Sequence, residues 1–338
     1  MSVHIGGTLM DVSKRTFLKG GAMIGALSAA VVGSGTTPGK TASGAPELPH
    51  ANPGWHGFGF GDIRAAVLSD GPLDQGDPVK TLLGRSEAEV RDTMRDSFLD
   101  PQNMTLDQNV LLIQAGSRLV LFDTGTGGAP LFGPKPGRLM ENIANIGVDS
   151  AAITDVVLTH AHPDHLWGLT GEDGAEHFPN AQVHLHEADH KFFTDPANDA
   201  HPLLGAFMPA CRKELETVAK RLNVVRDGQE ILPGVTAMLA PGHTPGHTAY
   251  RIDSGSKSLL VVGDLAHHHA VFTRYPDIRF GFDTDPAQMV ETRRSLFAMI
   301  AAERMTILAY HFPFPGLGNL ARDGDAYRWV PAGLDNAF

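Results

Sequence analysis

The chain has 338 residues, of which 42% are hydrophobic and 19% are charged. This balance supports a large folded core and excludes a chain that is disordered throughout. The formal net charge of −11 gives the protein no electrostatic reason to bind nucleic acid. Cys211 is the single cysteine, so an intrachain disulfide and a cysteine-based zinc site are both excluded. Histidine is unusually frequent, with 17 copies, and its clustering therefore decides which chemistry to expect.

The N-terminal segment has the order of regions found in an export signal. Lys14 and Arg15 precede a mildly apolar stretch at 20–32, and small residues follow at 41–45. The segment resembles a twin-arginine signal in which Lys14 replaces the first arginine. The alternative is a membrane anchor, but a bilayer span needs about 20 apolar residues. We therefore expect residues 1–45 to be an export signal for the twin-arginine machinery, and the protein to be periplasmic or secreted with no stable membrane span after cleavage.

Residues 46–338 are predicted to form a single domain. Residues 46–60, rich in Pro, Gly and aromatic side chains, have the composition of a lead-in, and short apolar runs then alternate with helical patterns. Strands are predicted at Ile63–Leu68, Asn109–Ile113, Leu119–Phe122, Asp155–Thr159, Val235–Leu239, Ala249–Ile252, Ser258–Val262 and Thr306–Ala309. Helices are predicted at Arg138–Ile146, Glu187–Phe193, Pro209–Leu222 and from Asp285, as N-cap, to about Arg304.

The order of these elements indicates the fold class. Strands fall into two groups, each followed by helices, which favours an α/β sandwich of two sheets with helices outside. The region 192–210 has the composition of a loop and is predicted to cover a site. No internal repeat is present.

The densest cluster of metal-binding side chains lies in the run Thr159-His-Ala-His-Pro-Asp-His165, directly after a predicted strand. Residues i and i+2 at a strand end point the same way, so His160 and His162 are expected to reach one ion. Asp164 and His165 lie on the following turn and can face a second ion. Three imidazoles and one carboxylate suit zinc, with manganese, iron or cobalt as alternatives.

The motif H-x-H-x-D-H resembles the signature of the metallo-β-lactamase superfamily, whose fold is an αββα sandwich of two mixed sheets flanked by helices. Further pieces match in chain order: Leu121–Gly125, Pro241–His247, Gly263–Leu265 and Ala309–His311. The resemblance implies two divalent metal ions. It assigns one ion to His160, His162 and His243, the other to Asp164, His165 and His311, and places Asp264 as the bridge between them. His243 is preferred over His247 because the ligand of this family follows Pro-Gly.

Within this superfamily the sequence is similar to the methyl parathion hydrolases over about residues 60–331. The similarity adds Phe132–Leu139, Phe314–Gly316 and Tyr327–Pro331 to the motifs above. It implies hydrolysis of a small phosphotriester or aryl ester by a hydroxide that bridges the metals, with Asp264 and Asp164 as the catalytic carboxylates. The sequence departs from this family at Ala161, at His267–His269 and in the loop at 191–209, and that loop helps to shape the substrate pocket of the family.

Other functions remain open at this point. A lactonase acting on acyl-homoserine lactones is the main alternative, while a β-lactamase and a non-catalytic metal-binding scaffold are disfavoured. The expected partner is a small ester or lactone and not nucleic acid, and a homodimer is left open. Supporting roles are expected for Asp123, which would orient a ligand, and for His247. His267–His269 are expected to be a surface or supporting cluster, and Cys211 a packing residue. Trp167, Phe132, Phe192 and Phe193 are candidates for a pocket wall but are more often plain core.

Overall fold

The computed structural model describes residues 53–333, all of which belong to one unit of the chain. The predicted export signal lies outside these residues. Among the helices of the described part, none is long and apolar enough to cross a membrane.

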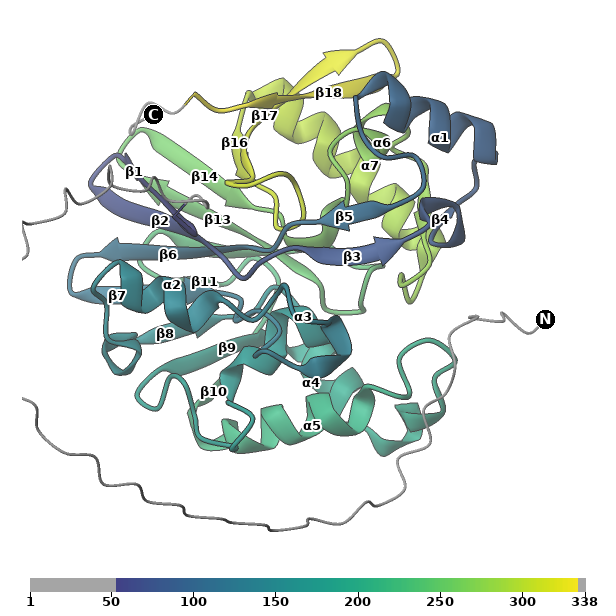
Figure 1. The fold of residues 1–338 in the computed structure, drawn as a ribbon. Coiled ribbons are helices and arrows are strands. Elements are labelled where there is room, and N and C mark those ends of the chain that lie inside the picture. Colours follow the sequence, from purple (N-terminus) through teal and green to yellow (C-terminus); the bar gives the residue numbers. More distant parts are fainter. Residues whose placement is uncertain (1–52, 334–338) are drawn as a thin grey trace, which may run out of the picture. The chain divides into compact units, whose positions relative to one another are not determined.

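Two mixed seven-stranded sheets form the centre of this unit (Figure 1). The first sheet has the order β1-β2-β6-β7-β8-β9-β10, and the second has the order β11-β12-β13-β14-β16-β17-β18. The strands of the first sheet are β1 (Trp55–Phe60), β2 (Ile63–Ser69), β6 (Asn109–Ala115), β7 (Arg118–Phe122), β8 (Asp155–Val157), β9 (Gln182–His186) and β10 (Leu222–Val225). Those of the second are β11 (Glu230–Leu232), β12 (Val235–Leu239), β13 (Thr248–Ser254), β14 (Lys257–Val261), β16 (Thr306–Leu308), β17 (Leu317–Asp323) and β18 (Ala326–Pro331).

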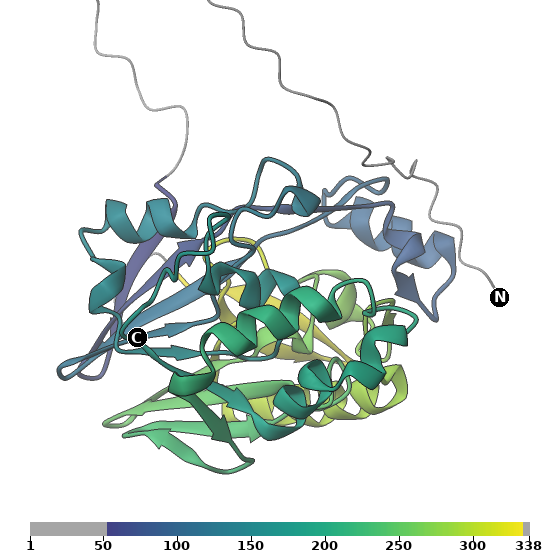
Figure 2. The same cartoon turned by 90° about the horizontal axis from the view of Figure 1, so that it is seen from below.

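Two short ribbons and the helices complete the unit. The ribbons pair β3 (Leu73–Gly76) with β5 (Met104–Leu106) and β4 (Leu82–Leu83) with β15 (Arg279–Phe280). The helices are α1 (Glu87–Asp96), α2 (Leu139–Asn145), α3 (Pro163–Leu166), α4 (Glu187–Thr194), α5 (Met208–Thr217), α6 (Val271–Arg274) and α7 (Pro286–Glu303). Figure 2, seen from below, looks onto the helices that cover the first sheet.

The alternation of side chains along the strands explains the four layers. In β6, Leu111 and Ile113 face the other sheet, whereas Val110 and Leu112 face helices α2 to α5. In β13, Tyr250 packs between the sheets and Ala249 faces the layer of α1, α6 and α7. Successive side chains of a strand point to opposite faces, so a strand buried on both faces is apolar throughout. This confirms the predicted αββα sandwich.

Several predicted elements have different bounds or were missed. Residues 55–60 are not a lead-in but edge strand β1, because Phe58 and Phe60 alternate with glycine and are buried against β2. The helix predicted at Pro209–Leu222 ends at Thr217, and Leu222 begins β10, which pairs with β9. The other predicted strands and helices are present within two residues of their expected ends.

Phe297 of α7 provides a test of the outer core. Its side chain is 1% exposed and meets the Tyr327 ring edge-on at 5.3 Å between centroids. We expect Phe297→Ala to lower the free energy of unfolding by about 3–5 kcal/mol, because the substitution leaves a cavity between α7 and the second sheet. Chemical denaturation measures this loss. Ser295→Ala, at an exposed position of the same helix, is the control and should change stability by no more than about 0.5 kcal/mol.

Candidate metal centre

All seven predicted ligands lie in loops or short helical turns that follow strands, and the structure brings them together at one end of the two sheets. His160 and His162 follow β8, and Asp164 and His165 lie in the short helix α3 directly after them. The other three follow strands of the second sheet, namely His243 after β12, Asp264 after β14 and His311 after β16. The centre is therefore shared by both halves of the sandwich.

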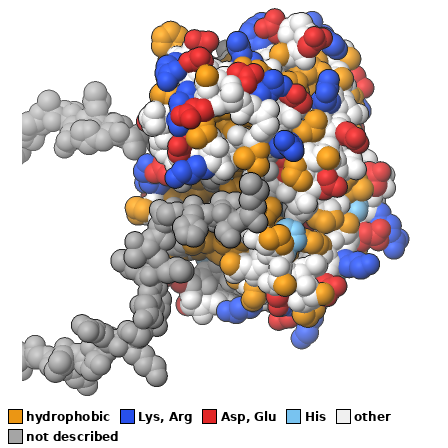
Figure 3. Space-filling view, turned by 90° about the vertical axis from the view of Figure 1, so that its right-hand side faces the viewer, with side chains coloured by type: hydrophobic (Ala, Val, Ile, Leu, Met, Phe, Trp, Pro, Cys, Tyr) orange, Lys and Arg blue, Asp and Glu red, His pale blue; other side chains and the backbone are white. Residues whose placement is uncertain are grey.

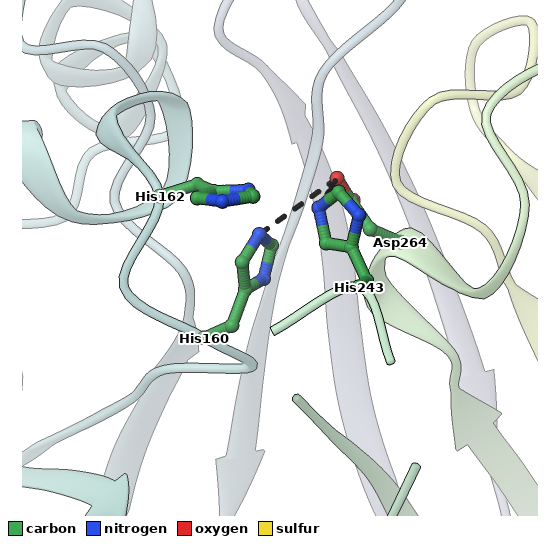
Figure 4. A group of neighbouring side chains, drawn as sticks. All are labelled: His160, His162, His243 and Asp264. Atoms are coloured by element: carbon green, nitrogen blue, oxygen red, sulfur yellow. Dashed lines mark ion pairs between the residues drawn. The ribbon is translucent and has the colours of Figure 1, made fainter. Parts of the chain in front are cut away.

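Potential ligand atoms form two groups. In the first, a nitrogen or oxygen atom from each of His160, His162, His243 and Asp264 lies within 4.8 Å of the others, and these side chains point toward one another in Figure 4. In the second, the same holds for Asp164, His165 and His311. This is the division that the sequence resemblance implied. That these residues bind metal remains a prediction.

Asp264 lies between the two groups. Its Oδ2 is 3.1 Å from Nε2 of His243 and 3.3 Å from Nε2 of His311, and its Oδ1 is 3.2 Å from Nε2 of His165. The position follows from the backbone, because Gly263 has φ +50° and a Cβ there would approach Nε2 of His247 to 2.7 Å. Arg293, buried in α7, donates to the carbonyl of Leu265 at 2.7 Å and thereby fixes the backbone next to Asp264.

The donor atoms fit a metal ion. The Nε2 atoms of four histidines and Oδ1 of Asp264 are buried with no hydrogen-bond partner in the described part of the chain: His160, His162, His165 and His243. Buried polar atoms without partners are costly, and divalent cations would satisfy them together. The contacts of His165 and His243 with Asp264 are short enough for ion pairs but not aligned as hydrogen bonds, which is consistent with atoms that converge on a common point.

The charges of the centre also suit a cation. Burial would raise the pKa of Asp264, but the imidazoles of His311 and His165 hold it well below its usual range. Burial would lower the pKa of His311, yet the Asp264 and Asp164 carboxylates override it and raise that pKa to about 10. Without a metal ion, the protonated imidazole of His311 therefore balances part of the negative charge of Asp264 and Asp164. A divalent ion can take the place of such protons, and metal binding to histidine generally releases them.

Hydrogen bonds on the far nitrogen fix most of the imidazole rings. Nδ1 of His165 is 2.9 Å from Asp123, Nδ1 of His243 is 2.9 Å from Asp283, and Nδ1 of His311 is 2.8 Å from the carbonyl of Asp107. Such partners select the tautomer that leaves Nε2 free for a metal.

Asp123 has the orienting role that the sequence predicted. It adopts a left-handed backbone conformation, with φ 64°, and also accepts from the backbone N–H of Thr159. A strained residue of this kind is typical of a functional site. Asp107 and Asp283 were missed by the sequence analysis, because an isolated aspartate outside a motif carries no signal.

His247 supports the loop and does not face the centre. It donates from Nδ1 to the carbonyl of Ala240, and its Nε2 accepts from the backbone N–H of Asp264, both at 2.9 Å. Both ring nitrogens are therefore used, which favours His243 as the ligand.

Of the two roles expected for His267, surface or supporting, its burial excludes the first, since it is 1% exposed. Its Nε2 is 3.1 Å from Oδ2 of Asp264, and its ring stacks on Phe280 at 3.8 Å. His267, Asp264 and His311 form a third group of converging donor atoms. However, Nδ1 of His267 is buried without a partner in the described residues, unlike that of the predicted ligands His165, His243 and His311. This favours a contact to Asp264 over direct metal binding.

A pocket of about 210 Å³ opens onto the centre. Apart from the histidines and aspartates of the centre, its wall is apolar except for Gln75: Leu73, Leu106, Leu131, Phe132, Pro163, Leu204, Phe207, Phe280 and Phe282. No Lys or Arg is among the described residues that line it. On the face of this unit that Figure 3 shows, hydrophobic side chains are interspersed with Lys, Arg, Asp and Glu side chains.

The four aromatic candidates from the sequence divide between pocket and core. Phe132 lines the pocket, and Trp167 packs behind it at 5.7 Å between ring centroids. Phe193 is fully buried and meets the His162 ring edge-on at 6.0 Å, while Phe192 packs against Phe193. The predicted loop at 192–210 contributes Leu204 and Phe207 to the pocket wall. Burial raises the pKa of the Cys211 thiol to about 12, as expected of an inert packing residue.

Comparisons with known proteins agree with this geometry. The family model of the metallo-beta-lactamase superfamily matches residues 104–311. A protein of Mycobacterium tuberculosis named probable metallo-hydrolase is 24% identical over 235 residues, which is 62% of this chain and 69% of that protein.

Two solved structures are similar over most of the chain. One is AidC, described as a dizinc quorum-quenching lactonase in complex with a product, with a TM-score of 0.77 and 26% identity over 83% of this chain and 98% of AidC. The other is the hydrolase AbOPH, with a TM-score of 0.78 and 28% identity over 84% of this chain and 99% of that chain. None of these matches tests the similarity to methyl parathion hydrolases, which stays a prediction. The chain belongs to the metallo-beta-lactamase superfamily and is one of its metal-dependent hydrolases.

Proposed function

We propose that this protein hydrolyses small uncharged lactones or alkyl carboxylic esters that carry an apolar group, with two divalent metal ions, of which zinc is the first choice. The observation that carries the proposal is the apolar pocket, which opens directly onto His162, Asp164, His243, Asp264 and His311 and has no Lys or Arg among its described lining residues. A lactone is favoured by the similarity to AidC, whose own structure holds N-hexanoyl-L-homoserine as product.

The residues of the chain divide the work of such a reaction. When bound, two divalent ions lower the pKa of water and polarise the oxygen of the scissile bond. The two groups of predicted ligands would hold them, and Asp264, which lies between the groups, would contribute to both. Asp123 and Asp283 fix the rings of His165 and His243, so that little reorganisation is needed during turnover. The pocket excludes water and holds the apolar part of the substrate against its wall.

Phosphotriesters and aryl esters are the second candidate class. Aromatic side chains favour it, since Phe132, Phe280 and Phe282 lie in the pocket wall and can stack on an aryl leaving group. The predicted similarity to methyl parathion hydrolases supports the same class.

A panel of substrates tests the proposal. Purified zinc-loaded protein is offered N-hexanoyl-homoserine lactone, p-nitrophenyl acetate, methyl parathion and a β-lactam, each with and without a chelator. We expect chelator-sensitive turnover that is fastest on the lactone. Preference for methyl parathion or p-nitrophenyl acetate would move the assignment to the second class. Preference for the β-lactam, whose carboxylate has no Lys or Arg partner among the described residues of the pocket, would overturn the proposal.

A further inference from the structure

Helix α4 places one carboxylate between the two histidine loops of the first metal position. Asp189 is fully buried, and its Oδ2 accepts from the backbone N–H of Ala161 at 2.9 Å. Its Oδ1 accepts from the backbone N–H of Gly246 at 2.6 Å. Ala161 lies between His160 and His162, and Gly246 lies three residues after His243. One carboxylate thus joins two segments that are far apart in the sequence.

The close approach of the Gly246 loop to α4 depends on the glycine. A Cβ at Gly246 would lie 2.9 Å from Oδ1 of Asp189 and closer still to the Asp189 backbone nitrogen. Any side chain there would push the loop away from α4, and with it His243. The absence of a side chain is therefore required for the contact, as is common where two backbones approach closely.

Asp189 acts differently from the other carboxylates around the centre. Asp123 and Asp283 contact an imidazole directly. Both oxygens of Asp189 instead accept from backbone N–H groups, so its effect on the rings passes through the loops that carry them. The second group of ligands, Asp164, His165 and His311, has no hydrogen bond to Asp189 among the described residues.

We propose that Asp189 is a positioning residue that ties the His160–His162 loop to the His243 loop and thereby sets the geometry of the first metal position. The proposal rests on the two-metal centre of the proposed function but not on its substrate class. In Asp189→Asn one carboxylate oxygen becomes an amide NH₂, which cannot accept a hydrogen bond. One loop N–H would then be buried without a partner, and the loop would shift.

Cobalt(II) titration of the metal-stripped full chain, followed by visible absorption, tests this role without any substrate. His162→Ala and His311→Ala identify the binding phases of the first and second positions. We expect Asp189→Asn to weaken the first phase by about 10–100-fold, the range found when partners of metal ligands are removed, and to leave the second phase unchanged. Asp123→Ala, which removes the oxygen that contacts Nδ1 of His165, should weaken the second phase more than the first.

The remaining variants separate positioning from general damage. Asp195→Asn changes another aspartate at the end of helix α4 and is the control. We expect it to keep both binding phases of the wild type, because Asp195 has no hydrogen bond to either histidine loop among the described residues. Gly246→Ala retains the carboxylate but displaces the loop, and should weaken the first phase as Asp189→Asn does. If Asp189→Asn does not fold, Gly246→Ala alone tests whether the contact between α4 and the His243 loop sets the first metal position. Two unchanged phases, or equal weakening of both phases, in Asp189→Asn and Gly246→Ala would overturn the proposal, whereas absence of binding in the wild type would overturn the metal centre itself.

Discussion

The Asp264→Ala variant is expected to lose metal and turnover together. The two oxygens of Asp264 lie between the two groups of predicted ligands, at 3.1–3.3 Å from His243, His165 and His311. Its removal deletes a shared ligand and leaves these imidazoles without their central carboxylate. We therefore expect a larger loss of affinity than the 10–100-fold that follows loss of a partner outside the ligand set. Metal content per chain, from elemental analysis, and turnover of the preferred substrate measure the two effects.

Asp92→Asn is the matched control, because Asp92 is an exposed aspartate of α1. It should retain the wild-type metal content and rate. Full turnover by an Asp264→Ala protein that holds no metal would contradict the role of Asp264 and the metal-dependent mechanism at once.

A negatively charged substrate is expected to be a much poorer substrate than its uncharged analogue. A carboxylate on the apolar group of the substrate would lie against the pocket wall formed by Leu106, Phe132 and Phe280. No Lys or Arg among the described lining residues can pair with it there. Burial of an unpaired charge costs several kcal/mol, and each 1.4 kcal/mol is about tenfold in rate or affinity. We expect kcat/KM for a carboxylated acyl ester to be at least about 100-fold below that of the matched alkyl ester.

The same comparison can be made within the protein. Leu106→Arg, in the pocket wall, should reduce the difference in kcat/KM between the two esters, because the arginine gives the substrate carboxylate a partner. Val224→Arg, at an exposed position of β10, should leave that difference unchanged. Equal kcat/KM values for the charged and uncharged esters in the wild type would show that the apolar wall does not select the substrate.

The sequence placed the predicted ligands in the groups that the structure brings together, partly from the spacing of the first motif and otherwise through the family resemblance. His160 and His162 leave a strand with a spacing of two, and Asp264 follows a strand that is apolar and therefore buried. The parts that depend on tertiary contacts were not predictable. Asp189 looks like any acidic residue in the first turn of a helix, and only the fold shows that two loops surround it.

The pocket shows the same limit. Leu73, Leu131 and Phe282 come from distant segments, and an apolar side chain that lines a cavity has the same pattern as one that fills a core. For β1, the glycines concealed the alternation of Phe58 and Phe60 that marks an edge strand. The strand that pairs with β1 and buries these residues is a separate segment, so the residues of β1 alone do not reveal that it is a strand.

Because the predicted ligands come from segments that follow strands of both sheets, an ion bound in this centre would join the two halves of the sandwich. Its binding free energy is then available only to the folded chain, and it adds to the work of separating the sheets. At a free metal concentration a thousand times the dissociation constant this contribution amounts to about 4 kcal/mol per ion, a large share of the stability of an ordinary domain. Metal supply would then govern how long the protein survives proteases and heat, as well as how fast it turns over its substrate.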